Sequence, residues 1–130
     1  MSSIGQMKRL FQNKTGMTTF YQLLEFDKEL KKLAKKYPTL PDDIEDIKPI
    51  LLETKTGIGK NFTIISTSEK IQIVKVRILC ESLRARTIRL IYAYHAKKIE
   101  FMYLEVYFKG KKENEDQERI NDYINNQEDI

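Results

Sequence analysis

The sequence contains one cysteine and one histidine, and these two shortages exclude several kinds of chemistry. A lone Cys80 excludes an internal disulfide and a cysteine-based zinc cluster, and a single cysteine in a strand is usually a small core side chain. With His95 as the only histidine, paired-histidine ribonuclease chemistry and a histidine-rich metal site are also excluded. No apolar run approaches the roughly 18 residues of a membrane-spanning helix, and the segment MSSIGQMKRLF lacks the apolar centre of a secretory signal. The sequence therefore predicts a cytoplasmic protein with no membrane partner.

Carboxylates are scarce in the middle of the chain. Glu100 and Glu105 are the only ones in the last predicted strand, so the chain is a poor candidate for a two-metal nuclease and we expect no metal or cofactor. Between residues 70 and 112, Lys and Arg outnumber Glu several-fold, whereas much of the acid lies in residues 42–53 and 113–129. This asymmetry indicates a polyanionic partner such as RNA or DNA, although a solvated charged surface produces the same counts.

The chain has the length of one ordinary domain, 130 residues. We interpret residues 1–17 as a flexible N-terminal extension and residues 18–130 as a single domain. A short strand over 19–24 precedes a helix over 26–37, in which apolar residues recur on one face. A second helix is predicted from Pro41 to about Lys48, and Pro49 should kink or split it. The two helices predict an antiparallel hairpin.

Four further strands and a final helix complete the predicted elements. The first of these strands covers residues 62–66, and a short amphipathic helix surrounds Tyr123. Between them, three strands in residues 70–112 show apolar residues on one parity, which predicts a sheet with one packed face. We expect the even-numbered residues of the last two strands to form the core. The opposite parity gives what we call the basic face: Lys75, Arg77, Arg89, Tyr107 and Lys109, with Glu105 and Thr87 among them. The predicted fold class is α+β, with an antiparallel or mixed sheet of four to five strands packed on the helical hairpin.

The basic face suits metal-independent cleavage of RNA. The 2′-hydroxyl of RNA can attack the adjacent phosphate, and the protein must then orient the attack, stabilise charge on the phosphorane and move protons. Arginine matches two phosphate oxygens with its planar fork, and lysine or tyrosine can transfer protons where the site shifts the pKa. All three residue types are present on this face.

Several segments in order resemble the RelE/ParE superfamily of toxins from type II toxin–antitoxin systems, on the RelE/HigB side. They are the helix pattern FDKELKKLAKKYP, then Lys75-Val76-Arg77, Arg89-Leu90-Ile91-Tyr92 and a terminal Tyr-Phe-Lys-Gly-Lys, and the likeness covers about residues 18–125. The resemblance implies a RelE-like sheet packed on helices, an endoribonuclease (mRNA interferase) that cuts mRNA in the ribosomal A site, and an antitoxin that wraps the toxin in a hetero-oligomer. It also implies translation inhibition as the biological effect.

Carried over by position, the resemblance makes Arg89 the phosphate-stabilising arginine and makes Lys75 and Arg77 the basic pair on the preceding strand. Lys109 stands where the family often has a second arginine. A family tyrosine that stacks on the base has two candidates here, Tyr107 on the last strand and Tyr123 in the tail. RNA contacts are expected from Arg84, Arg86, Lys111 and Lys112, of which the two arginines are equally well explained as loop charges.

Three alternatives remain open from the sequence. The ParE branch inhibits DNA gyrase and is not a nuclease, so the chain could be a non-enzymatic toxin. It could also be an inactive binding module. Thirdly, the basic residues of the face could serve stability alone, by pairing with Glu105 and with the acidic side chains of the tail.

Overall fold

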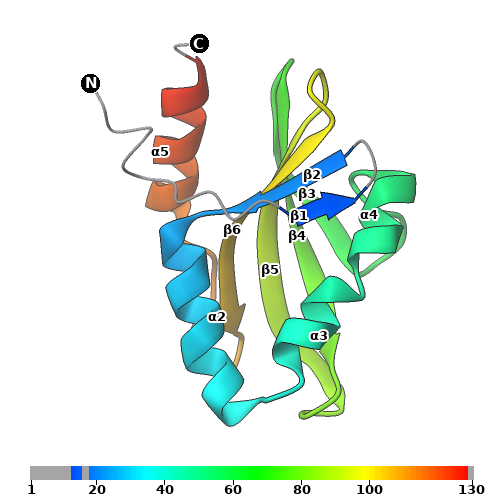
Figure 1. The fold of residues 1–130 in the computed structure, drawn as a ribbon. Helices are drawn as coiled ribbons and strands as arrows, with labels where there is room; N and C mark the ends of the chain where they lie inside the picture. The colour runs from blue at the N-terminus through cyan, green and yellow to red at the C-terminus, as the bar shows by residue number, and fades with distance from the viewer. Residues whose placement is uncertain (1–12, 16–17, 129–130) are drawn as a thin grey trace.

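The computed structural model describes residues 13–15 and 18–128. These residues form the predicted α+β fold, with a sheet of six strands, one more than the predicted maximum (Figure 1). The elements in chain order are β1 (Asn13–Thr15), β2 (Thr18–Gln22), α2 (Leu24–Lys36), α3 (Leu40–Glu45), α4 (Lys48–Thr54), β3 (Phe62–Thr67), β4 (Ile71–Cys80), β5 (Ala85–His95), β6 (Glu100–Phe108) and α5 (Gln117–Glu128).

The additional strand comes from the segment that we expected to be a flexible extension. Asn13–Thr15 forms β1, which pairs antiparallel with β2 at the edge of the sheet. Residues 1–12 and 16–17 of the predicted extension lie outside the described residues, so their flexibility stays a prediction.

The strands lie in the order β1-β2-β6-β5-β4-β3. The three long strands follow one another as antiparallel neighbours, because the chain returns through the short loops between β4 and β5 and between β5 and β6. β2 lies parallel to β6, which makes the sheet mixed. The helices α2, α3 and α4 cover one face of this sheet (Figure 1).

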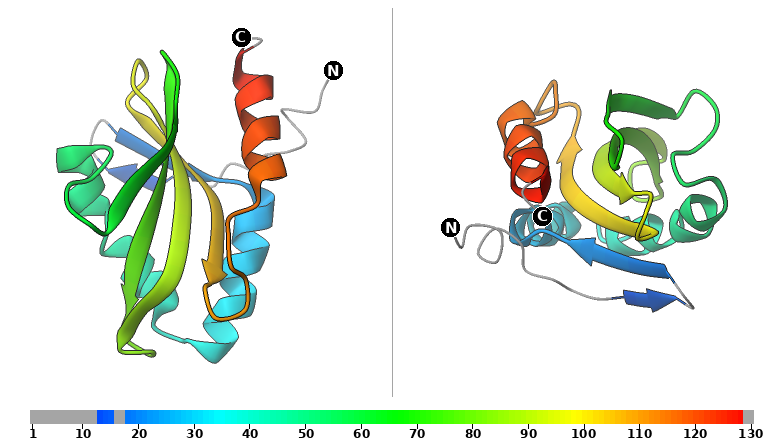
Figure 2. Two further views of the ribbon diagram at one scale, coloured as in Figure 1. Left: turned by 180° about the vertical axis from the view of Figure 1, so that it is seen from behind. Right: turned by 90° about the horizontal axis from the view of Figure 1, so that it is seen from above.

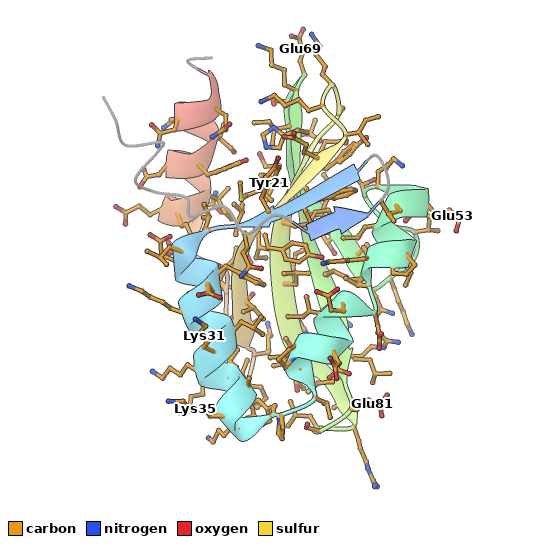
Figure 3. The ribbon with its side chains drawn as sticks, viewed as in Figure 1. Tyr21, Lys31, Lys35, Glu53, Glu69 and Glu81 are labelled. Carbon is orange, nitrogen blue, oxygen red and sulfur yellow. The ribbon has the colours of Figure 1, made fainter. Side chains whose placement is uncertain are left out.

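The helices differ from the prediction mainly at their ends. α2 begins at Leu24, two residues before the predicted start, and buries Phe26, while its exposed Lys31 and Lys35 point away from the sheet (Figure 3). The second predicted helix is split as expected, but the break comes at residues 46–47, before Pro49. Pro49 takes the second position of α4, where a missing backbone N–H costs no hydrogen bond.

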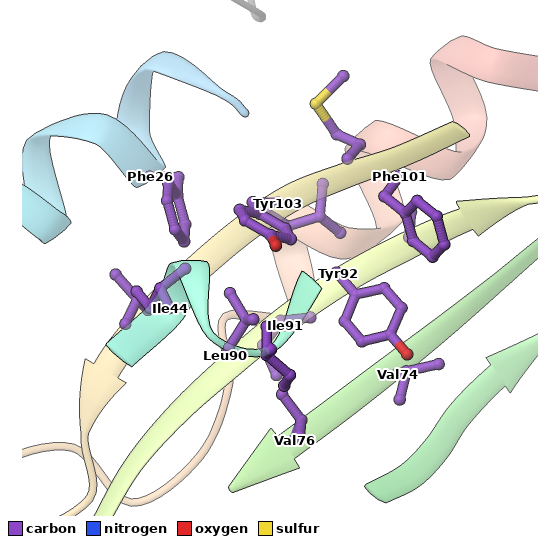
Figure 4. Close-up of a cluster of buried hydrophobic side chains, with 14 of the residues drawn as sticks. Phe26, Ile44, Val74, Val76, Leu90, Ile91, Tyr92, Phe101 and Tyr103 are labelled. Carbon is purple, nitrogen blue, oxygen red and sulfur yellow. The ribbon is translucent and has the colours of Figure 1, made fainter. Parts of the chain in front are cut away.

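Aromatic side chains fill the space between the sheet and the helices (Figure 4). Phe20 stacks on Phe101 with ring centroids 4.8 Å apart, and Phe26 packs against Tyr103 at 5.3 Å. The hydroxyl of Tyr92 donates a hydrogen bond of 2.7 Å to the backbone carbonyl of Lys55. Burial of this kind contributes roughly 1.5–3 kcal/mol for each large apolar side chain.

A β-bulge between β5 and β6 makes the alternation of side chains along β6 differ from the predicted one. Ile91 pairs with Glu105, but the next residue, Tyr92, pairs with Tyr103, so β6 carries one extra residue at this point. Because a bulge shifts side chains to the opposite face, the odd-numbered Phe101 and Tyr103 face the helices. The expectation that the even-numbered residues of β6 face the helices is therefore wrong for residues 100–103, which precede the bulge in the chain.

α5 lies beside β6 and next to α2 (Figure 2), and its Tyr123 packs against His95 of β5. It has twelve residues and is longer than the short helix predicted. The chain reaches it by turning at the end of β6 and running back along that strand (Figure 2). The tail consequently covers part of the face that the sequence predicts to be open. Among the described residues, no helix is long and apolar enough to cross a membrane.

Candidate functional site

Three side chains of the basic face form a row across the three central strands. Arg77 on β4 lies directly opposite Arg89 on β5, and Arg89 lies directly opposite Tyr107 on β6. Directly opposed residues of antiparallel strands have Cβ atoms about 4.5–5.5 Å apart. We call these three residues the arginine row. The row lies on the sheet face away from α2, so the helices do not cover it.

The two arginines of the row have no acidic partner. Neither guanidinium forms an ion pair with a carboxylate among the residues that the structure describes. Arg89 instead donates a hydrogen bond of 2.7 Å from Nη1 to the backbone carbonyl of Arg86. Partial burial and the nearby charge of Arg77 lower the pKa of Arg89, and Tyr107 opposes this shift. Two cations held side by side without a counterion form a place where an anion would be stabilised.

Lys75 has a different environment, because a residue of the tail pairs with it. Its Nζ lies 2.9 Å from a carboxylate oxygen of Glu115, and the side chains retain 24% and 16% of their exposure. Burial alone would raise the pKa of Glu115, but the hydrogen bond and the charge of Lys75 outweigh it and hold this pKa below its usual value. For Lys75, the predicted pairing with an acidic tail residue is therefore confirmed.

Tyr107 completes the row with a hydroxyl group that is buried. The residue is 5% exposed, and its buried hydroxyl makes no hydrogen bond of standard geometry among the described residues, although it interacts with the nearby Glu115 carboxylate. Burial, followed by the negative charges of Glu115 and Glu105, raises the pKa of Tyr107 to about 12, while Arg89 opposes the rise. The phenol is thus protonated at neutral pH and able to donate a hydrogen bond. Tyr107 lies on the basic face as predicted, but the tail folds over it and buries it.

Glu105 anchors that tail to the sheet. The residue is 1% exposed, its Oε2 accepts a hydrogen bond from Lys112, and its Oε1 accepts one of 2.8 Å from the backbone N–H of Asp116. Further along, Arg119 donates to Glu29 on α2 and to the carbonyl of Leu104. The predicted pairing of Glu105 with the arginines of the face is not found, because Lys112 takes that carboxylate.

Tyr123, the alternative to Tyr107 in the predicted site, lies elsewhere. It belongs to α5 and is buried between this helix and the sheet, where its hydroxyl is hydrogen-bonded to Nε2 of His95. Burial is the main cause that raises the pKa of Tyr123, and Glu100 adds to it. His95 is six residues beyond Arg89 on β5, which corresponds to roughly 20 Å along a strand. Of the two tyrosines, the structure places only Tyr107 beside Arg89.

The remaining predicted site residues lie near the row, at the turn between β4 and β5 and just after the end of β6. Lys109 donates a hydrogen bond of 3.1 Å from Nζ to the carbonyl of Glu113. Arg84 and Arg86 are exposed near the turn between β4 and β5, and Arg86 donates to the carbonyl of Arg77 at 3.3 Å. Lys111 is also exposed. Together with the row they extend the positive charge along one side of the sheet.

The site is open at Arg77 and covered by the tail at Tyr107, which differs from the enclosed pocket of an enzyme for small molecules. A cavity of about 240 Å³ opens beside β4, with Arg77 and Arg86 in its lining, but the same cavity is lined by Asp43 and Asp46. Among the described residues, no group of His, Cys, Asp and Glu could hold a metal ion. The open shape is suited to a polymer.

Sequence reasoning did not identify Glu115 as a site residue. Its position depends on the turn after β6 and on the anchoring of the tail by Glu105. In the sequence, Glu115 is one of several acidic residues in a polar segment, and no local pattern distinguishes it from Glu113.

Comparison with known proteins gives one similarity in structure. A chain of the crystal structure of the archaeal RelE–RelB complex from Pyrococcus horikoshii OT3 is similar over 70% of this chain and 93% of that chain, with 16% sequence identity and a TM-score of 0.48. No family model and no curated protein matches this sequence. At this identity and TM-score, the similarity assigns no role to any residue of this chain.

Proposed function

We propose that this protein is the toxin of a type II toxin–antitoxin system and that it cuts mRNA on the ribosome without a metal ion. The observation that carries the proposal is the arginine row, where Arg77 and Arg89 lie side by side with no carboxylate partner described. Opposed like charges are destabilising in a sheet. A bound phosphate group would compensate this repulsion, which supports a role for the pair in binding.

In the proposed reaction, the 2′-oxygen of a nucleotide attacks the adjacent phosphorus, and the bond from phosphorus to the 5′-oxygen breaks. The products are a 2′,3′-cyclic phosphate and a free 5′-hydroxyl. Arg77 and Arg89 hold the phosphate and stabilise the charge that develops on its oxygens in the phosphorane. Tyr107, with its raised pKa, carries a proton that it can donate to the departing 5′-oxygen.

Further cations around the row are proposed to hold neighbouring phosphates of the RNA. They are Lys75, Lys109, Arg84, Arg86, Lys111 and Lys112. Contacts of this kind are independent of base sequence, and they make binding dependent on salt concentration. We also propose an antitoxin protein as partner, since the cell that produces such a nuclease must neutralise it.

The proposed function is tested by induced expression in a bacterial host, with the 5′ ends of cellular RNA mapped after induction. We expect growth arrest and new 5′ ends with free hydroxyl groups within coding regions. Arg89→Ala should reduce cleavage by about 10²–10³-fold, as loss of one stabilising donor does in other enzymes. Arg89→Lys, which keeps the charge and loses the planar fork, should recover part of this loss.

Lys35→Ala serves as the matched control, because it removes one positive charge from α2, on the opposite side of the sheet. This variant should remain toxic. Induction of the DNA damage response without RNA cleavage would contradict the proposal and favour inhibition of gyrase. Absence of any growth effect would favour an inactive binding module.

A further inference from the structure

Glu115 lies over the basic face between two of its members. Its carboxylate contacts Lys75 on β4 at 2.9 Å, and its charge acts on Tyr107 on β6. Lys75 pairs with Ile91 in the register, and Tyr107 pairs with Arg89, so the two residues mark a diagonal across β5. A carboxylate that reaches both ends of this diagonal lies above the centre of the face, close to the arginine row.

The position of Glu115 is fixed from both sides. On its C-terminal side, the backbone N–H of Asp116 donates to the buried Glu105, and Asp116 accepts a hydrogen bond of 3.1 Å from the N–H of Arg119 at the start of α5. On its other side, Lys109 donates to the carbonyl of Glu113. A carboxylate that is held at a defined place and remains 16% exposed can meet a ligand without rearrangement of the sheet.

We propose that Glu115 is the general base of the RNA cleavage reaction, and this assignment rests on the proposed function. Its carboxylate takes the proton from the 2′-hydroxyl while the oxygen of that group forms its bond to phosphorus. The bond to the 5′-oxygen breaks, and this oxygen takes a proton from the Tyr107 hydroxyl. Glu115 has then gained one proton and Tyr107 has lost one, so proton exchange with water restores both residues.

The buried hydroxyl of Tyr107 lies beside the Glu115 carboxylate, and the interaction between the two contributes to both pKa shifts. Because this contact does not reach the geometry of a full hydrogen bond, a ligand that bonds to the hydroxyl would stabilise it further. The pKa shifts of Glu115 and Tyr107 are also opposite in direction, since the pKa of Glu115 is lowered and that of Tyr107 is raised. Two neighbouring groups whose pKa values are driven apart are suited to act as base and acid at the same pH.

RNA binding would also increase the basicity of Glu115. In the free protein, Lys75 holds the pKa of Glu115 down, whereas burial acts in the opposite direction. A phosphate that takes over the ammonium group of Lys75 removes the hydrogen bond and leaves the effect of burial. The carboxylate then becomes a stronger base when the substrate is in place.

An alternative role for Glu115 predicts the opposite result. If this carboxylate only covers the basic face, its negative charge repels RNA, and its removal should accelerate cleavage. If it is the base, its removal should slow cleavage, while RNA binding should be unchanged or stronger. The direction of the rate change therefore separates the two roles.

The experiment measures single-turnover cleavage of a labelled mRNA on programmed ribosomes, with purified full-length wild type, Glu115→Gln and Glu113→Gln. Binding is measured separately with an mRNA that carries a 2′-deoxy nucleotide at the cut position. We expect Glu115→Gln to lower the cleavage rate by about 10²–10⁴-fold without weaker binding. Glu113→Gln makes the same chemical change two residues away on an exposed side chain, and it should cut within about twofold of wild type.

Chemical rescue provides a readout that a structural role would not change. Glu115→Ala should regain part of its activity when formate is added, because a free carboxylate can occupy the vacated place, whereas Arg89→Ala should not respond. If Glu115→Gln cuts as fast as wild type or faster, the assignment of Glu115 as the base is overturned. If Arg89→Ala is inactive in the same assay, the proposed function still stands. A wild-type protein that cuts no RNA would overturn both.

Discussion

Arg77 and Arg89 lie directly opposite each other on β4 and β5, and neither has a carboxylate partner among the described residues. The adjacent pair on the same face, Lys75 and Glu115, is neutralised. The sheet therefore presents two kinds of cation, one balanced within the fold and one left for a ligand. In the free protein, an arriving phosphate would therefore meet the two arginines without competition and would have to displace Glu115 from Lys75.

Replacement of Arg77 by Gln should increase stability and decrease activity. The change removes the repulsion with Arg89 and keeps most of the side-chain stem, so the free energy of unfolding should rise by about 0.2–1 kcal/mol. Urea unfolding checks the stability, and RNA cleavage checks the activity. Lys35→Gln, an equal charge change on α2, should leave both quantities nearly unchanged. A fall in stability of more than about 1 kcal/mol for Arg77→Gln would contradict the absence of a structural partner.

Replacement of Tyr107 by Phe should leave stability unchanged or increase it slightly. The hydroxyl is buried and makes no hydrogen bond of standard geometry with a described residue, so its removal costs only the weak interaction with Glu115 and relieves a desolvated polar group. Cleavage should nevertheless fall by about 10²-fold or more, because the proposed proton donor is lost. The measurements are thermal unfolding and single-turnover cleavage. A variant with normal cleavage would exclude Tyr107 as the acid.

Replacement of Tyr123 by Phe should have the opposite pattern. This hydroxyl is hydrogen-bonded to His95, so its loss should lower the free energy of unfolding by about 1 kcal/mol. Cleavage should remain close to that of wild type, since Tyr123 lies far from Arg89 along β5. Comparison of the two Phe variants in the same assays decides which tyrosine belongs to the site.

Replacement of Glu105 by Ala should loosen the tail. Its carboxylate accepts hydrogen bonds from Lys112 and from the backbone of Asp116, and loss of a buried, doubly bonded acceptor costs about 1–3 kcal/mol. Amide hydrogen exchange should accelerate in residues 109–119 more than in β4. Exchange that is equally slow in this segment would show that Glu105 does not anchor it.

The ion pair of Glu115 should make stability depend on pH in the acidic range. Because the pKa of Glu115 is below its ordinary value of 4.5 in the folded protein, the unfolded state binds the proton more readily. The contribution is therefore fully present above about pH 5.5 and is lost as the pH falls through the folded-state pKa. The difference in unfolding free energy between wild type and Glu115→Gln should shrink below about pH 4.5. A difference for Glu115→Gln that does not change with pH would refute the ion pair.

Local patterns in the sequence determined most of the elements. Alternating apolar residues in β4 and the first half of β5 predicted their faces correctly, because the period of a strand needs no information from elsewhere in the chain. The stripe that includes Phe26 predicted α2, and the prolines predicted the division of the next helix. The resemblance to RelE toxins also selected Arg89 as the centre of the site, and that role remains a prediction.

Only the tertiary structure decided which residues surround Arg89. The bulge opposite Ile91 reverses the alternation on β6, and pairing between strands determines where such an extra residue falls. The path of the tail places Glu115 on Lys75 and buries Tyr107, while it carries Tyr123 away to His95. These contacts join residues far apart in the chain, and their energies depend on burial and on neighbouring charges. The sequence by itself determined the cations of the face, and folding alone determined which of them lack a partner.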